Sequence, residues 1–312
     1  MRHSLYWDDF SQRLAETVTC IKAGQPVPVR RVAVFVTQAC NFRCSYCNMP
    51  NKPRTMSKAT FEQIVDSYPD AIIHITGGEP SVVGWLYPYI IERGWERRFH
   101  LNTNAYIMPP ARHIQRLKVS LDSCDAGYWD QLVGEPGAFK EVVKNIKTAS
   151  RQTVTSITYT LTRENYWDAI KFASFARNEF PDLYAVFFSV YKGTNPRFAF
   201  RQRDIDDFFG YVLPPLQEGL NDESRALLNE TLNEKLRLIE GVRFPDNNID
   251  NPCYLSMSER VYGPNGVESN CSHLYRDGII GTGSKKCDKC QYGCNQRLVQ
   301  FNNLAESFLT RP

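Results

Sequence analysis

Three cysteines in the segment CNFRCSYCN, residues 40–48, carry the strongest chemical signal in this chain of 312 residues. Cys40, Cys44 and Cys47 have the spacing C-x3-C-x2-C. Thiolates bind iron-sulfur clusters and zinc, and a cubic cluster of four irons normally takes four of them. Three protein ligands therefore leave one iron open for another molecule. A zinc knuckle is the alternative, although structural zinc sites favour paired C-x2-C units.

A second group of five cysteines lies near the C-terminus: Cys253, Cys271, Cys287, Cys290 and Cys294. Five thiols suffice for one 4Fe-4S cluster with one to spare, and the C-x2-C pair also fits a structural zinc site. Between the first two cysteines, the segment YGPNGVESN predicts a β-hairpin with its turn at residues 264–266.

Short polar motifs follow several apolar runs of the chain. TGGEP (76–80), NTN (102–104) and SLDS (120–123) each come at the end of such a run. Gly77 and Gly78 allow another group to approach the backbone closely. Taken alone, the polar side chains of these motifs are as often caps of strand ends as ligands.

The elements that position these motifs alternate between strands and helices. Six runs predict strands: 31–36, 71–76, 98–103, 117–122, 153–161 and 183–190. Apolar residues at helical spacing predict helices after Ser57 and around residues 139–146, and Asn165 is a candidate cap for a third. Strand and helix alternation indicates an α/β fold with a parallel sheet, and six units predict a partial, TIM-like (β/α)6 barrel.

Beyond residue 218 the alternation fails. Residues 221–241 predict a charged amphipathic helix or helical pair, and residues 244–252 a turn-rich linker. We therefore divide the chain into an N-terminal extension (1–30), the partial barrel (31–218), a helical linker (219–252) and a cysteine-rich domain (253–312).

Composition limits the classes of function. The chain is 42% hydrophobic with a formal net charge of +3, which is too mild to indicate a nucleic-acid partner. No signal peptide and no membrane-spanning run is apparent, so we expect a cytoplasmic protein without membrane contact. Thiols stay reduced in that compartment, and the ten cysteines therefore indicate metal rather than disulfides.

The cysteine triplet, followed in order by GGEP and the polar strand ends, resembles the radical S-adenosylmethionine (SAM) superfamily over roughly residues 31–200. The resemblance implies a 4Fe-4S cluster on Cys40, Cys44 and Cys47 whose open iron binds SAM. It further implies a SAM site built from Tyr46, Gly77, Gly78, Glu79, Asn102, Asn104, Ser120 and Asp122. In this reading Glu79 accepts from the SAM ammonium, Tyr46 lines the adenine site, and residues 188–190 offer backbone groups to the adenine.

The second cysteine group resembles the SPASM and twitch auxiliary-cluster extensions of the same superfamily. A full SPASM domain has more cysteines, so the resemblance favours one twitch-like 4Fe-4S cluster on Cys253, Cys271, Cys287 and Cys290. Cys294 is then a spare thiol or an alternate fourth ligand. A structural zinc site remains the alternative.

Hydrogen abstraction by a 5'-deoxyadenosyl radical is the first step that the resemblance implies. If the auxiliary cluster takes up the remaining electron, the product is oxidised and a general base is needed, for which Asp122, Asp125 and Glu164 are candidates. If the product is an epimer, Cys124 is the candidate hydrogen donor, with a role as an apolar filler as the alternative.

We expect a small polar metabolite, such as a sugar, cyclitol or nucleotide-like molecule, as the substrate of an oxidoreductase. A peptide-modifying or epimerising enzyme is the alternative, and a non-catalytic metal-binding module the second alternative. A flavodoxin- or ferredoxin-type protein is the expected electron donor. The basic loop 191–203 is a candidate receptor for a substrate phosphate or carboxylate, or else a solvated surface segment.

Overall fold

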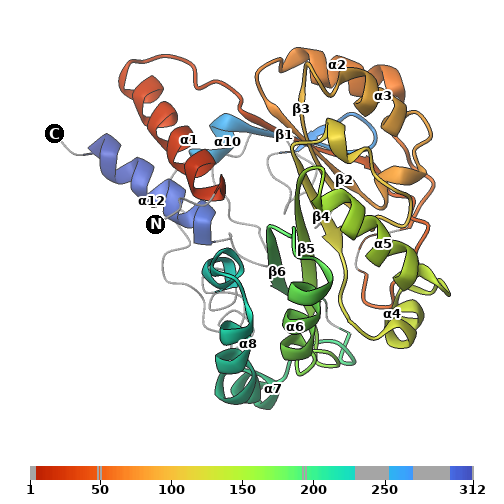
Figure 1. The fold of residues 1–312 in the computed structure, drawn as a ribbon. Helices are drawn as coiled ribbons and strands as arrows, with labels where there is room; N and C mark the ends of the chain where they lie inside the picture. The colour runs from red at the N-terminus through yellow and green to blue at the C-terminus, as the bar shows by residue number, and fades with distance from the viewer. Residues whose placement is uncertain are drawn as a thin grey trace.

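The structure is a computed structural model that describes residues 5–47, 49, 51–191, 193, 195–228, 253–269 and 296–310. All six predicted strands are present: β1 (Arg31–Thr37), β2 (Ile72–Gly77), β3 (Arg98–Thr103), β4 (Arg116–Ser120), β5 (Val154–Leu161) and β6 (Ala185–Val190). They pair in parallel in the order β6-β5-β4-β3-β2-β1 (Figure 1). The expected parallel α/β sheet is confirmed, and it does not close into a barrel.

Helices cover one face of this sheet. They are α2 (Lys58–Ser67), α3 (Leu86–Arg93), α4 (Ala126–Val133), α5 (Ala138–Ser150) and α6 (Ala169–Glu179), with short 3-10 turns η1 (Pro80–Val82) and η2 (Ala111–His113). The side chain of Ser57 caps α2 as predicted, because its hydroxyl accepts from the Thr60 amide at 3.1 Å. Alternate strand residues such as Val34, Ile75 and Leu101 are fully buried against these helices.

The predicted cap at Asn165 is wrong. Asp168 occupies the N-cap position of α6, and the side chain of Asn165 turns back into the loop after β5. Its amide donates to the carbonyls of Asp122 and Thr160 at 3.1 and 3.0 Å. Asn165 therefore ties the ends of β4 and β5 together instead of starting a helix.

The predicted hairpin near the C-terminus is present, and it extends the barrel sheet. Strand β7 (Glu259–Tyr262) pairs in parallel with β1, and β8 (Glu268–Ser269) pairs antiparallel with β7. Gly266 in the turn has φ +73°, a left-handed conformation that favours glycine. The sheet thus has eight strands in the order β6-β5-β4-β3-β2-β1-β7-β8.

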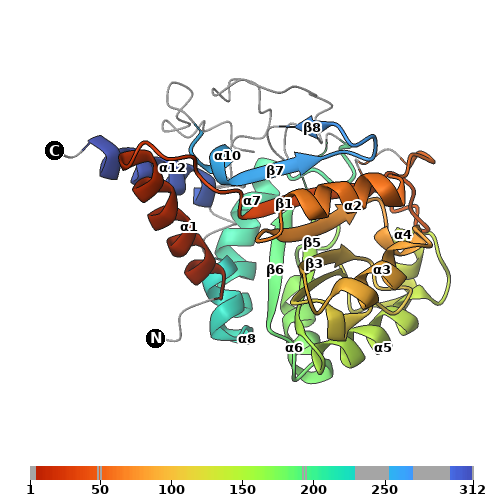
Figure 2. The same cartoon turned by 90° about the horizontal axis from the view of Figure 1, so that it is seen from above.

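The two ends of the described chain pack together beside this extension. Helix α1 (Leu5–Lys22), in the N-terminal extension for which the sequence predicts no element, lies against α12 (Gln296–Thr310) and the short α10 (Leu255–Ser258) (Figures 1 and 2). Phe10 meets Phe301 edge to face at 5.4 Å between ring centroids. These contacts form a second, smaller apolar cluster, separate from the core between the sheet and its helices.

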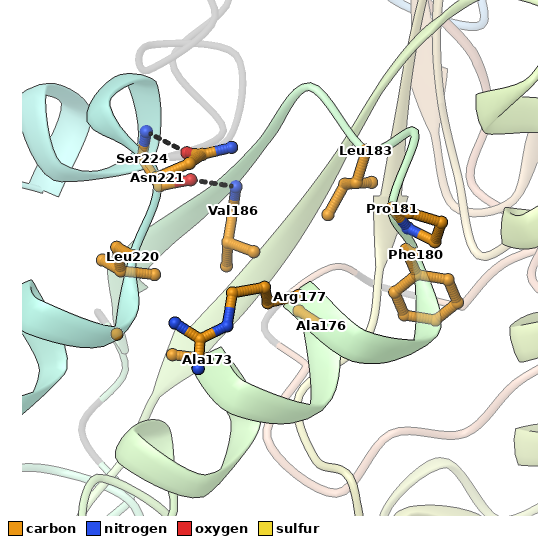
Figure 3. A pocket seen from close by; sticks show the side chains of 11 residues that line it. Ala173, Ala176, Arg177, Phe180, Pro181, Leu183, Val186, Leu220, Asn221 and Ser224 are labelled. Atoms are coloured by element: carbon orange, nitrogen blue, oxygen red, sulfur yellow. Dashed lines mark hydrogen bonds between the residues drawn. The ribbon is translucent and has the colours of Figure 1, made fainter.

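After β6 the chain forms α7 (Gln202–Asp207), a π-helical segment η3 (Phe208–Val212) and α8 (Leu213–Gly219), and residues 222–228 are helical. Ser224 accepts from the Val186 amide at 2.9 Å, so this helix covers the free edge of β6. A cavity of about 170 Å³ lies here between α6 and Leu220 (Figure 3). It contains none of the predicted site residues. Within the described residues, no helix has the length and hydropathy to cross a bilayer.

Candidate active site

The cysteine loop follows β1 at the carboxyl end of the sheet. Its three thiols are free, with Cys47 exposed and Cys40 and Cys44 partly buried. The loop is fastened to the end of α4, since Arg43 donates to the Val133 carbonyl at 2.8 Å and Ser45 to the Leu132 carbonyl at 3.0 Å. Its backbone is therefore positioned by hydrogen bonds that involve no cluster.

Two side chains of the loop region add to this anchoring. Phe42 is buried between the rings of Tyr106 and Trp129, at centroid distances of 5.5 and 5.7 Å. Asn51 accepts from the Cys40 amide at 3.2 Å and donates to the Cys40 carbonyl at 3.3 Å. The first cysteine is therefore held at both of its backbone groups.

The glycines of TGGEP let the end of β2 lie directly against the chain that precedes Cys40. Gly78 donates to the Thr37 carbonyl at 2.7 Å, and Glu79 donates to the Ala39 carbonyl at 2.8 Å. A Cβ on Gly77 would lie 2.4 Å from the Thr37 oxygen, and one on Gly78 would lie 2.2 Å from the Ala39 oxygen. The close approach predicted for these glycines is made by the protein's own backbone.

Glu79 is buried and binds protein groups. Its carboxylate accepts from the Thr103 hydroxyl at 2.6 Å, the Asn104 amide at 2.7 Å and the Ser81 amide at 2.9 Å. Burial raises the pKa of Glu79, and these donors oppose the shift. The idea that Glu79 also accepts from the SAM ammonium stays a prediction.

Asn104 completes a chain of contacts from β3 to the cysteines. Its side-chain amide donates to Asn41 Oδ1 at 2.8 Å, directly beside Cys40.

Asn41, Asn51 and Thr103 were not predicted as site residues. An Asn next to a cysteine ligand, and a Thr at a strand end, were the sequence signals available for two of them.

Tyr46 and Asp122 join the cysteine loop to the end of β4. The Tyr46 hydroxyl donates to Asp122 Oδ2, and the Thr160 amide donates to Asp122 Oδ1 at 2.5 Å. Asp122 is 1% exposed. Burial raises the pKa of Asp122 to about 6, against the lowering effect of these two donors. The edge of the Tyr46 ring meets Phe198 at 6.2 Å.

The other predicted SAM contacts lie on the face of the sheet that the helices leave free. Asn102 and Ser120 alternate with fully buried neighbours, so both point away from the helix layer. Asn102 is paired with Lys118 on β4, and Ser120 with Thr158 on β5. Their contact with SAM stays a prediction.

The candidate bases differ in their surroundings. Asp125 is the N-cap of α4 and accepts from the Tyr128 amide at 2.8 Å. Glu164 accepts from the Arg197 guanidinium at 2.6 Å. Of the three, Asp122 is the carboxylate that is buried and in contact with the cysteine loop.

Cys124, the candidate hydrogen donor, packs against the core beside α6. Burial raises the pKa of its thiol, and the charges that act on it next are those of Lys171, Asp168 and Asp125. These groups belong to the helix layer. The environment of Cys124 favours the packing role over the hydrogen-donor role.

The cations of the basic loop have acidic neighbours. Besides the Arg197–Glu164 pair, Arg201 lies 3.1 Å from Asp204 and Arg203 lies 3.8 Å from Asp207. Lys192 lies outside the described residues. These pairs favour the reading of this loop as a solvated surface segment.

Of the second cysteine group, Cys253 is described. It is a partly buried free thiol beside the α1–α12 cluster, and the Asn302 side chain donates to its sulfur at 3.8 Å. Cys271, Cys287, Cys290 and Cys294 lie outside the described residues. The auxiliary ligand set therefore stays a prediction.

The chemistry of the three thiols in the cysteine loop fits a cubic iron-sulfur cluster. Such a cluster takes one thiolate per iron, so Cys40, Cys44 and Cys47 would each bind a different iron. The Phe42 amide donates to Cys40 Sγ at 3.4 Å, a contact that stabilises a thiolate. Burial raises the pKa of Cys40 to about 11 and that of Cys44 further, so cluster binding has to release protons.

Comparison with known proteins agrees with this geometry. A family model described as the radical SAM superfamily matches residues 34–176. The AdoMet-dependent heme synthase of Nitratidesulfovibrio vulgaris is 29% identical over 40% of this chain and 38% of its own length. The GTP 3',8-cyclase of a Sulfurovum species is 31% identical over 40% of this chain and 43% of its own. The matched segments therefore span about two fifths of these relatives.

Solved structures extend the likeness to nearly the whole chain. Streptococcus suis SuiB, bound to S-adenosylmethionine, superimposes with a TM-score of 0.60 at 14% identity, over 99% of this chain and 74% of its own. The protein anSMEcpe, with bound AdoMet and a peptide, gives a TM-score of 0.58 at 14% identity, over 91% of this chain and 84% of its own. At this identity the likeness concerns the fold.

Proposed function

Because this chain belongs, through residues 34–176, to the radical SAM superfamily, we propose that it oxidises a small polar metabolite by way of hydrogen abstraction. Enzymes of this superfamily use a 4Fe-4S cluster and SAM, and solved structures that share this fold hold AdoMet. The observation that carries the proposal is the anchored cysteine loop at the carboxyl end of the sheet, where such folds bring reacting groups together.

Cys40, Cys44 and Cys47 would hold the cluster in this proposal. When bound, the cluster supplies SAM with one electron, which releases methionine and a 5'-deoxyadenosyl radical that abstracts a substrate hydrogen. Gly77, Gly78 and Glu79 act mainly by holding the end of β2 against the chain before Cys40. Asn104 then fixes the end of β3 to the same loop, together with Asn41.

Tyr46 and Asp122 would form one side of the SAM site. Among the three candidate bases, Asp122 is favoured because Asp125 is engaged in capping α4 and Glu164 in pairing with Arg197. Asp122 can accept a proton from the substrate as it is oxidised, provided that the Tyr46 hydroxyl moves to another acceptor. Asn102 and Ser120 are the remaining polar groups proposed for SAM or substrate.

The second electron of the oxidation would leave through an auxiliary 4Fe-4S cluster in the domain of residues 253–312. Cys253 lies in the described part of that domain, next to the hairpin that joins the barrel sheet. A flavodoxin- or ferredoxin-type protein would supply the first electron. Continuity of the sheet through β7 supports a fixed position of Cys253 relative to the cysteine loop.

Anaerobic reconstitution tests the core of this proposal. The wild-type protein should hold about eight irons and eight sulfides per chain and form 5'-deoxyadenosine from SAM with dithionite. Cys44→Ser should lose about four irons and all 5'-deoxyadenosine formation. Cys20→Ser, on α1, is the matched control and should keep both. SAM cleavage by Cys44→Ser at the wild-type rate would refute the proposal.

A peptide-modifying or epimerising reaction is the second candidate. Two solved structures of this fold, SuiB and anSMEcpe, contain peptides. Epimerisation would place solvent deuterium on carbon in the product, whereas oxidation leaves product carbon without it. A metal content of four irons and one zinc per chain, in place of eight irons, would also favour a redox-neutral reaction, because zinc accepts no electron.

A further inference from the structure

The segment that carries the cysteine triplet is basic. Residues 38–60 contain no aspartate or glutamate and four exposed cationic side chains: Arg43, Lys52, Arg54 and Lys58. Lys58 lies 3.5 Å from Glu62 within α2. The other three have no carboxylate partner among the described residues. We call Arg43, Lys52 and Arg54 the loop cations.

Two of the loop cations, Lys52 and Arg54, lie beside the first cysteine. The Asn51 side chain binds both backbone groups of Cys40. Further along, the Gln38 amide donates to the Arg54 carbonyl at 2.8 Å, and the Arg54 amide donates to the Lys52 carbonyl at 2.8 Å. This segment therefore runs back along the chain that leads to Cys40, with both cations on one tight turn.

The third loop cation, Arg43, lies within the cysteine loop, three residues after Cys40. Its Cβ faces the turn at the end of α4, where a Cβ on Gly134 would lie 3.6 Å from it. The next residue of that turn, Glu135, is acidic, and its carboxylate lies 3.5 Å from the Tyr106 hydroxyl. The loop cations thus outnumber the carboxylate of the adjoining turn.

Cys47 is the exposed thiol of the triplet. Each cleavage of SAM in the proposed function requires one electron, which another protein delivers to the cluster. Electrons pass between proteins only when the two redox centres come close together. The donor therefore has to dock where the cysteine loop is exposed, and the loop cations lie in and beside that loop.

Complexes between electron-transfer proteins are small and depend on charge. Their interfaces bury less than about 1,200 Å² in total. Complementary charges guide the partners together and raise the association rate by about 10- to 1,000-fold, an effect that falls steeply with ionic strength. A few exposed cations without internal partners are therefore sufficient to select an acidic donor.

We propose that the loop cations form the docking surface for the electron donor, a small acidic electron-transfer protein. This inference rests on the proposed function, because it names the partner of the same site. The reduced donor loses one electron and the cluster gains it, and no atom is transferred. Carboxylates of the donor would meet the loop cations close to the exposed thiol, so that association is fast and sensitive to salt.

Binding of an acidic flavodoxin to the cluster-loaded protein tests this inference. Flavin fluorescence gives the dissociation constant, and anaerobic stopped flow gives the rate at which flavodoxin hydroquinone reduces the cluster. At low salt, Lys52→Glu and Arg54→Glu should each weaken binding and slow reduction by about three- to tenfold, because charges at an interface rim act on the association rate. At about 1 M salt, where the Debye length is about 3 Å, the variants and the wild type should agree.

Arg112→Glu is the matched control. Arg112 is also exposed, but it lies in η2, directly before β4 and therefore at the opposite edge of the parallel sheet. This variant should bind flavodoxin like the wild type. Reduced methyl viologen, a small cation that needs no docking surface, should reduce the cluster of every variant no more slowly than that of the wild type. Lys52→Gln and Arg54→Gln replace any charge reversal that loses iron.

Equal dissociation constants and rates for the wild type, Lys52→Glu and Arg54→Glu would overturn the inference, as would the same slowing by Arg112→Glu. Binding of neither flavodoxin nor an acidic ferredoxin would overturn it too. Measuring 5'-deoxyadenosine with methyl viologen separates it from the proposed function. SAM cleavage with viologen, together with donor binding that ignores these charges, refutes the docking surface alone. Charge-dependent donor binding without SAM cleavage supports the docking surface and refutes the proposed function.

Discussion

The contact between Tyr46 and Asp122 connects the cysteine loop to the sheet through two side chains. Asp122 takes its second hydrogen bond from the Thr160 backbone on β5, so one carboxylate orients three segments of chain. A buried carboxylate costs free energy unless donors surround it. Removing one of its donors should therefore lower both the free energy of unfolding and the rate of SAM cleavage.

Tyr46→Phe removes the hydroxyl and leaves the ring. We expect the free energy of unfolding to fall by about 1–3 kcal/mol, because a buried acceptor loses a charge-assisted bond, and SAM cleavage to slow. Urea unfolding and 5'-deoxyadenosine formation measure the two effects. Tyr106→Phe is the control, since that hydroxyl lies 3.5 Å from Glu135 and should matter little. Strictly additive effects of Tyr46→Phe and Asp122→Asn would contradict a direct interaction.

Residue types and spacing identified some site members and not others. Tyr46 and Asp122 were predicted from their motifs, and the structure brings them together. The assignment of Glu79 to a ligand could not foresee its protein donors, because Thr103 and Ser81 reach it through the fold. Asn41 and Asn51 were not predicted for the same reason, because their partners, the Asn104 side chain and the Cys40 backbone, are brought to them by the fold.

At the scale of elements, a substitution in the loop after β2 can test how closely this loop must approach the chain before Cys40. Gly78→Ala would place a Cβ against the Ala39 carbonyl, where 2.2 Å is available. We expect a loss of about 2–4 kcal/mol in unfolding free energy and reduced iron content, because the backbone bonds to Thr37 and Ala39 must lengthen. Gly84→Ala is the matched control: no atom lies within 4 Å of its Cβ position. Similar losses in both variants would show that the close approach is unimportant.

His100 on β3 makes the stability of the fold depend on pH. Its pKa is about 2 in the fold, through burial and through Arg116, Arg31, Arg98 and Lys118, whereas an unfolded His titrates near 6.5. Below about pH 6.5 the unfolded chain binds a proton that the folded chain does not, so stability falls as the pH falls. The imidazole of His74 lies edge to face with the His100 ring, at 6.3 Å between the ring centroids.

His100→Gln should remove this contribution. Between pH 7.5 and pH 5.0 the wild type should lose about 2 kcal/mol more unfolding free energy than the variant, as follows from linkage for one proton. Urea unfolding at the two pH values gives the difference, and the comparison at pH 7.5 sets the baseline. Equal losses in the two proteins would mean that His100 takes up a proton in the fold.

Element prediction succeeded where burial sets the pattern. The strands β1 to β6 were predictable because alternate residues of each apolar run are buried in the core. Helix α2 was predictable because its cap, Ser57, bonds an amide only three residues away. The cap at Asn165 failed because tertiary contacts with Asp122 and Thr160 outweigh its local preference. The hairpin turn was visible locally, but the pairing of β7 with β1 joins residues more than 200 positions apart and has no local signature.

At the scale of the whole molecule, the chain ends close the open side of the sheet at β1. Strand β7 covers the β1 edge and α1 packs on α12, so residues before and after the barrel form one unit with it. The pair of Arg13 on α1 and Glu259 on β7 spans this unit. Edge strands need such cover, because their free backbone groups otherwise pair with other chains.

Arg13→Met tests whether this closure depends on the ion pair. The side chains of Arg13 and Glu259 are 10% and 20% exposed, so the pair lies between a surface bridge and a buried one. We expect a loss of about 2 kcal/mol in unfolding free energy, because Glu259 is left without its cation. Glu259→Gln should cost less, since it leaves a neutral amide to accept from Arg13. Lys144→Met, at the exposed pair with Glu141, should change stability by less than about 0.5 kcal/mol. If Arg13→Met behaved like Lys144→Met, the closure would have to rest on the strand pairing and the Phe10–Phe301 contact instead.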